Sequence, residues 1–120
     1  MILGRGLALA GLALVVAGPA AAHSLLLESR PAANATLSAP PRQIALRFNN
    51  RIEKSLSRVR LLDARGVAQP LALAADDAPD RLTAAVPALP PGRWWVEWQV
   101  LSTDGHVVSG RFEFRLAPAH

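Results

Sequence analysis

The segment RWWVEWQVL, residues 93–101, decides the fold class of this chain because its apolar residues recur at every second position. Side chains two residues apart along a β-strand lie on the same face of a sheet. One face is therefore predicted to lie in the core, and it carries Trp94, Val96, Trp98 and Val100. The other face carries Glu97 and Gln99, and we expect Trp95, which shares that face, to be partly exposed.

Short alternating runs continue on both sides of this strand, separated by Pro, Gly, Asn and Asp, which is typical of an all-β domain. The predicted strands are HSLLLES (23–29), QIALRF (43–48), SRVRLLD (57–63), VAQPLAL (67–73), RLTAAV (81–86), RWWVEWQVL (93–101) and RFEFRL (111–116). Pro70 cannot donate to a ladder, so it predicts an edge strand. The stretch 30–41 is expected to be a proline-bounded connection. About seven strands at this spacing predict an immunoglobulin-like antiparallel sandwich.

The start of the chain has the layout of an export signal. Arg5 precedes an apolar run at residues 7–18, and Ala20 and Ala22 occupy the two small-residue positions of a cleavage site. A membrane anchor is the alternative, but the run is short for a span of about 20 residues. We expect residues 1–22 to be a signal peptide cut after Ala22, with residues 23–120 forming one exported domain that has no membrane span. Cuts after Ala20 or Ala21 are the alternatives.

Composition excludes several classes of function. The chain has no cysteine, so zinc fingers, thiol redox chemistry and cysteine-ligated copper are excluded, and the domain is held by packing alone. Its 13 basic and 9 acidic side chains leave a mild positive excess that is spread along the sequence. We therefore expect no nucleic-acid binding. The sequence shows no large exposed apolar strand, and a monomer is expected.

The segment STDGHVVSG, residues 102–110, places Asp104 two residues before His106. In an extended segment, both side chains would face one point. The alternative is a turn in which Asp104 caps a backbone amide, Gly105 permits the bend and His106 lies on the surface. The pair alone does not decide between these two interpretations.

Cleavage after Ala22 would make His23 the first residue of the exported protein. An N-terminal histidine offers its α-amine and its imidazole Nδ1 to one metal ion, and an amine with a pKa of about 8 is readily deprotonated by a metal. His106 would add a third nitrogen and Asp104 an oxygen. Three nitrogens suit Cu(II), whereas zinc prefers a tetrahedral set and calcium needs more oxygens. The one methionine, Met1, leaves with the signal, so no soft ligand favours Cu(I).

The sequence resembles the CopC family of periplasmic copper-binding proteins. The resemblance is carried by His23 after AAA, by LLLESRPAANATLSAPP (25–41), by IALRF (44–48) and by LPPGRWWVEWQVLSTDGHVVSGRFEF (89–114). It implies a seven-stranded Greek-key β-sandwich and one Cu(II) ion per chain, with His23, Asp104 and His106 as ligands. It also implies copper carriage, buffering or sequestration in the periplasm, often alongside an inner-membrane copper permease of the CopD type.

The sequence departs from the family pattern in two places. Some members have a methionine-rich Cu(I) loop, but residues 64–78 contain neither methionine nor histidine, so a Cu(I) site is not expected. Some members place a glutamate near the copper after the second strand, where this chain has Asn49 and Asn50. We expect Asn50 to make a contact around the metal without being a ligand. Glu28 is expected on the surface or paired with an arginine.

Two other functions use the same residues differently. Oxidative polysaccharide-cleaving enzymes also bind copper through an N-terminal and a second histidine, so a small copper oxidase or monooxygenase is the alternative to a carrier. The short chain, the absence of tyrosine and the lack of an exposed aromatic platform favour a binding protein that is not an enzyme. A purely structural immunoglobulin-like module would bind no stoichiometric metal.

Overall fold

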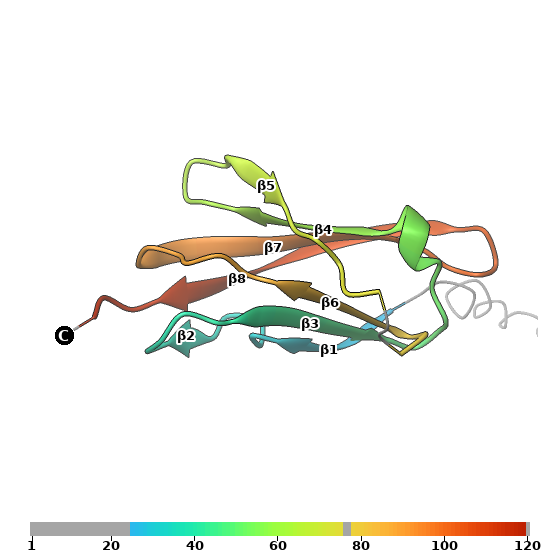
Figure 1. Cartoon of the computed structure of the whole chain (residues 1–120), viewed down its shortest axis with the longest axis horizontal. Helices are drawn as coiled ribbons and strands as arrows, with labels where there is room; N and C mark the ends of the chain where they lie inside the picture. Colours follow the sequence, from blue (N-terminus) through green and yellow to red (C-terminus); the bar gives the residue numbers. More distant parts are fainter. Residues whose placement is uncertain (1–24, 76–77, 120) are drawn as a thin grey trace, which may run out of the picture.

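The computed structural model describes residues 25–75 and 78–119, which form two β-sheets packed face to face (Figure 1). A three-stranded sheet has the order β1-β3-β6, and a five-stranded sheet has the order β2-β8-β7-β4-β5. The elements are β1 (Leu26–Arg30), β2 (Thr36–Leu37), β3 (Gln43–Phe48), the 3₁₀ helix η3 (Lys54–Leu56), β4 (Arg58–Leu62), β5 (Ala68–Pro70), β6 (Arg81–Ala85), β7 (Gly92–Leu101) and β8 (Val107–Leu116). The predicted all-β sandwich is confirmed.

The described residues contain eight strands where the sequence predicts about seven. The additional strand is β2, which lies inside the predicted connection 30–41. It pairs in parallel with the end of β8, where Thr36 lies opposite Arg115 and Leu37 opposite Leu116. This pairing makes the sandwich mixed and not purely antiparallel. A strand of two residues is too short to show an alternation, and its pairing partner is distant in sequence. The sequence pattern therefore does not reveal β2.

The predicted edge strand is confirmed at β5. Pro70 lies opposite Arg60 of β4, and β5 is the last strand of the five-stranded sheet. An edge position suits a residue that lacks an amide hydrogen. Among residues 25–75 and 78–119, no helix has the length and apolar character needed to cross a membrane. The predicted signal peptide lies outside the described residues.

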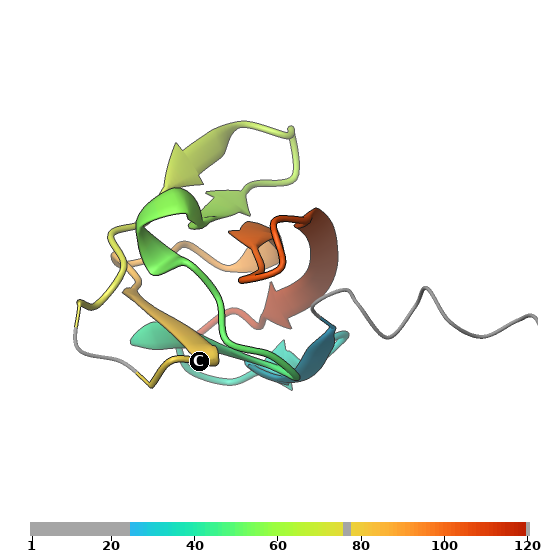
Figure 2. The ribbon, with the colours of Figure 1, turned by 90° about the vertical axis from the view of Figure 1, so that its right-hand side faces the viewer.

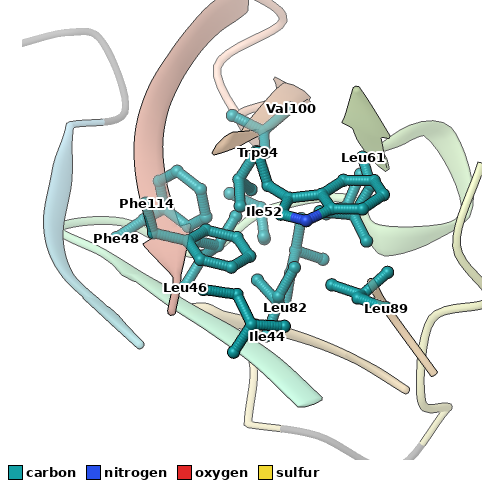
Figure 3. Close-up of a cluster of buried hydrophobic side chains, with 13 residues drawn as sticks. Ile44, Leu46, Phe48, Ile52, Leu61, Leu82, Leu89, Trp94, Val100 and Phe114 are labelled. Carbon is teal, nitrogen blue, oxygen red and sulfur yellow. The ribbon is translucent and has the colours of Figure 1, made fainter. Parts of the chain in front are cut away.

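The core lies between the sheets and is built from the faces that the alternation predicts (Figure 3). Val96, Val100 and Phe114 have no exposed surface, and Trp94 is 9% exposed. Trp98 and Phe112 are half-buried at the margin of this core. The remaining members of the buried cluster are Ile44, Leu46, Phe48, Ile52, Val59, Leu61, Leu82, Leu89 and Leu116.

The indole of Trp98 takes the space that a side chain at position 110 would need. Trp98 and Gly110 lie opposite each other on β7 and β8. The ring contacts Phe48 at a centroid distance of 6.4 Å and Phe112 at 6.2 Å. A Cβ atom at Gly110 would lie 2.2 Å from Cζ2 of Trp98. Glycine is therefore required here by the aromatic cluster that joins the two sheets.

Candidate metal centre

Asp104 and His106 lie in the hairpin loop between β7 and β8. The two strands pair from Gly92 opposite Leu116 to Leu101 opposite Val107. At the loop, Ser102 N–H donates to the His106 carbonyl at 3.0 Å, and Gly105 N–H donates to the Ser102 carbonyl at 2.9 Å. Gly105 has a φ of +90°, which suits the left-handed position of a three-residue hairpin loop. The segment is a tight turn, which is the second of the two interpretations that the sequence leaves open.

The turn nevertheless brings the two side chains together. Asp104 Oδ1 lies 3.2 Å from His106 Nδ1 and accepts the His106 backbone N–H at 3.1 Å. The hydroxyl of Ser102, a residue only 1% exposed, also donates to this oxygen. Asp104 therefore caps the turn, as the structural interpretation of the sequence predicts, and it also faces the imidazole.

The same hydrogen bonds keep the Asp104 carboxylate ionised. They lower its pKa from 3.8 to about 2, chiefly through the Ser102 hydroxyl and then through the His106 backbone N–H. Because the pKa in the folded protein lies below the ordinary value, the contribution of this carboxylate to stability is fully present above pH 3.8 and is lost as the pH falls through about 2. At neutral pH, a negative charge is therefore fixed beside His106.

The contact with Asp104 also orients the imidazole. A histidine whose Nδ1–H donates to a carboxylate presents Nε2 as the nitrogen that can ligate a metal. The side chain of His106 is 55% exposed, and that of Asp104 is 36% exposed. The pair lies at the surface, where an ion can reach it from solvent.

The segment 49–52, which follows β3, connects the start of the described chain to this hairpin. The Leu25 N–H donates to Asn49 Oδ1 at 2.8 Å, and the Asn49 N–H donates to the Leu25 carbonyl at 3.0 Å. Ile52, three residues later, forms a β-bridge with Ser102 in the hairpin. The start of β1 and the β7–β8 loop therefore lie at the same end of the sandwich, the end that faces the viewer in Figure 2.

Asn49 is a positioning residue that the sequence reasoning missed. The observed hydrogen bonds to Leu25 come from Asn49, whereas the contact of Asn50 around the metal stays a prediction. The sequence did draw attention to this segment, because the chain has Asn49 and Asn50 where some family members have a glutamate. Which of the two amides turns toward Leu25 depends on how β3 ends, and the alternation of β3 does not reveal that.

The third expected ligand, His23, lies outside the described residues. Within residues 25–75 and 78–119, no group of three or more His, Cys, Asp or Glu side chains is placed to hold a metal ion. Asp104 and His106 are thus two candidate ligands, and a metal site built on them would need further donors from elsewhere. Glu28 is not one of these donors by geometry, because it pairs with Arg47 Nε at 3.4 Å, as expected for a surface carboxylate.

Comparison with known proteins gives consistent matches over most of the chain. The family model described as the CopC domain matches residues 26–117. The crystal structure of CopC from Methylosinus trichosporium OB3b is similar with a TM-score of 0.74 and 34% identity, covering 82% of this chain and 97% of that one.

Two curated Escherichia coli proteins are also similar. Protein YobA of strain K12 is 32% identical over 96 residues, which is 78% of this chain and 77% of that protein. Copper resistance protein C is 29% identical over 121 residues, which is 94% of this chain and 96% of that protein. With its sandwich, its hairpin pair and a family model that covers most of its length, the chain belongs to the CopC family.

Proposed function

We propose that this protein binds one Cu(II) ion per chain through His23, Asp104 and His106, and that it carries, buffers or sequesters copper in the periplasm. One observation carries the proposal: Asp104 Oδ1 and His106 Nδ1 lie 3.2 Å apart on a hairpin that segment 49–52 connects to Leu25, the first described residue. Membership of the CopC family and the name of its relative copper resistance protein C support copper as the ion.

The donor set favours the cupric ion. The α-amine and imidazole of His23 would supply two nitrogens, and His106 would supply a third. Cu(II) prefers nitrogen and oxygen donors in tetragonal surroundings and binds them more tightly than the other divalent ions of its row. The ionised carboxylate of Asp104 adds negative charge, which offsets the charge of Cu(II) and disfavours its reduction.

This site requires export and processing. We propose that residues 1–22 are removed after Ala22, which exposes the α-amine of His23 in the periplasm. The intact mass of the exported protein tests this directly, because cuts after Ala20 or Ala21 would add residues before His23. The resemblance to CopC also supports an inner-membrane permease of the CopD type as the partner that exchanges copper with this protein.

A small copper oxidase or monooxygenase is the alternative that shares these ligands. All six aromatic side chains of the chain lie in its described part, and each is buried or half-buried. This leaves no open aromatic surface of the kind that would hold a polysaccharide. We therefore propose a binding protein and not an enzyme. Sustained peroxide-driven oxidation of a polysaccharide by the copper-loaded protein would reject the carrier function.

Titration of the purified protein with Cu(II) tests the site itself. We expect saturation at one equivalent and an electron paramagnetic resonance spectrum of a type-2 centre with nitrogen hyperfine couplings. The structural-module alternative predicts no stoichiometric uptake, so a featureless titration would reject the proposed site.

Replacement of the hairpin ligands should separate their roles. His106→Ala should weaken Cu(II) binding by orders of magnitude, because it removes one of three nitrogens. Asp104→Asn should have a smaller effect, because the amide oxygen can still accept hydrogen bonds in the turn while the negative charge is lost. Competition with a chromophoric chelator gives both affinities, and Ser109→Ala, outside the loop, serves as the control. Equal losses for His106→Ala and Asp104→Asn would contradict this division.

Asn49→Leu should weaken Cu(II) binding about tenfold without removing a ligand, as is typical for residues that support metal ligands. The substitution leaves the Leu25 N–H without its acceptor, so Leu25 is held less firmly. Asn49→Asp keeps an acceptor oxygen and should retain affinity. Gln43→Leu makes the same amide-to-leucine change at the other end of β3 and should have no effect. An Asn49→Leu protein with full affinity would exclude this positioning role.

A further inference from the structure

The outer face of the five-stranded sheet carries a dense set of arginines. Side chains paired across β4, β7 and β8 form rows on this face, such as Arg58–Gln99–Ser109 and Arg60–Glu97–Arg111. We name it the arginine face and define it by Arg58, Arg60, Arg93, Arg111 and Arg115 together with Glu97 and Glu113.

The two carboxylates of the arginine face are both engaged by arginines. Arg60 Nε donates to Glu97 Oε1 at 2.9 Å. Glu113 Oε2 lies 3.0 Å from Arg93 Nε and 3.6 Å from Arg115 Nε. Five guanidinium groups thus face two carboxylates, which leaves an excess of three positive charges on one side of a small domain. Such a field attracts and orients an acidic partner.

A hollow of about 310 Å³ lies within this face. Its lining residues are Arg58, Arg60, Glu97, Trp98, Gln99, Ser109, Gly110 and Arg111. Three guanidinium groups and one carboxylate surround it, so it can accept carboxylate side chains that protrude from a partner. A concave polar site favours protruding side chains of a protein over the flat surface of a bilayer.

Trp95 lies on the arginine face, and tryptophan is a residue type that often anchors protein interfaces. It is half-buried, and the guanidinium carbons of Arg93 and Arg111 lie 5.7 Å and 5.8 Å from its ring centroid. These cation–π contacts hold both arginines over the ring and reduce the entropy that they would lose on binding. Tryptophan and arginine are the residues most enriched at the energetic centres of protein interfaces.

We propose that the arginine face is a docking surface for an extended, acidic segment of a partner protein. Arg58 and Arg60 lie two residues apart on one face of β4, about 7 Å from each other along the strand. Acidic residues at every second position of an extended partner have the same spacing, so one can pair with Arg58 and the next can reach the N–H groups of Arg60 that Glu97 does not use. Bidentate guanidinium–carboxylate pairs then select this partner.

The docking surface lies beside the candidate metal centre. Gln99 and Ser109, which line the hollow, are two residues from Leu101 and Val107, where the strands enter the hairpin that carries Asp104 and His106. A partner on the arginine face would therefore reach the metal end of the molecule without covering it. Docking itself does not depend on copper, so metal-free protein can test it separately from the proposed function.

The experiment uses ¹⁵N-labelled, metal-free protein and a synthetic peptide in which glutamate alternates with threonine. We expect peptide-dependent amide shifts confined to β4, β7 and β8, and affinity that falls steeply as salt is added. A peptide in which glutamine replaces glutamate should not bind. Shifts centred on β1, β3 and β6, absence of binding at low salt, or binding to phosphatidylglycerol vesicles in preference to the peptide would each overturn the proposal.

Charge reversal provides the matched comparison. The double substitution Arg58→Glu and Arg111→Glu should weaken peptide binding at least about tenfold. Arg30→Glu with Arg81→Glu makes the same change in net charge at a smaller hollow of about 190 Å³ on the outer face of the other sheet, and should leave binding within about twofold. Arg58→Gln with Arg111→Gln repeats the test without reversing charge. If charge reversal on either face lowered the peptide affinity equally, net charge alone would explain the loss, and the docking surface would be rejected.

Discussion

One alanine added before His23 is expected to weaken Cu(II) binding by orders of magnitude. The extension converts the α-amine of His23 into a peptide nitrogen, which holds its proton far more tightly than an amine with a pKa of about 8. It therefore removes one nitrogen donor and breaks the chelate ring that the amine closes with the imidazole. The new α-amine then belongs to the added alanine and not to His23. His106 and Asp104 remain, but they are two donors where the proposed site needs more.

Affinity by chelator competition and nitrogen hyperfine couplings give the two readouts for this extension. The control adds one alanine after residue 120, which changes the mass equally and leaves the proposed terminus intact. The mass of each protein confirms which residue comes first. If the extended protein binds Cu(II) as tightly as the control, the N-terminal site is wrong, whatever the effect of His106→Ala.

Gly110→Ala is expected to destabilise the fold by about 2–3 kcal/mol, the upper part of the range for overpacking a core. The new Cβ would lie 2.2 Å from the Trp98 ring, and that ring is confined by Phe48 and Phe112. The indole cannot shift without disturbing contacts between the two sheets. A domain of this size should lose about 10 °C or more in its thermal midpoint.

A double-mutant cycle tests whether the loss of stability comes from the steric clash between the new Cβ and the Trp98 ring. In a Trp98→Leu background the obstructing ring is absent, so Gly110→Ala should cost much less there than in the native sequence. Ser109→Ala, at the neighbouring position on the outer face, is the single-substitution control and should change stability little. Full native stability in Gly110→Ala would show that the ring has room to move.

The core and the hairpin that carries the candidate site share the strands β7 and β8. β7 and β8 supply Val96, Val100 and Phe114 to the core, and their shared loop supplies Asp104 and His106. Ser102 is buried at the junction, where it donates to Asp104 and bridges to Ile52. The hairpin is thus packed against the core on one face, and the hydrogen bonds of Ser102 and the His106 backbone N–H hold the Asp104 carboxylate in the turn.

The strands with strict alternation were predictable, and the short or irregular elements were not. Residues 93–101 and 111–116 have a two-residue period, and a period of two assigns each side chain to one face regardless of the rest of the fold. β2 has no period, since it contains two residues that pair with a distant strand end. The turn at Asp104 was one of two interpretations, because a pair of residues two apart fits both an extended strand and a tight loop.

The sequence alone was sufficient for the all-β class, the edge position of Pro70, the apolar faces of the long strands and the choice of Asp104 and His106 as a candidate pair. These features depend on local periodicity and residue chemistry. Only the tertiary structure decided that Asn49 hydrogen-bonds to Leu25, that Trp98 excludes a side chain at Gly110 and that arginines from three strands gather on one face. Each of these depends on contacts between residues far apart in sequence, which are formed when the sheets pair and pack.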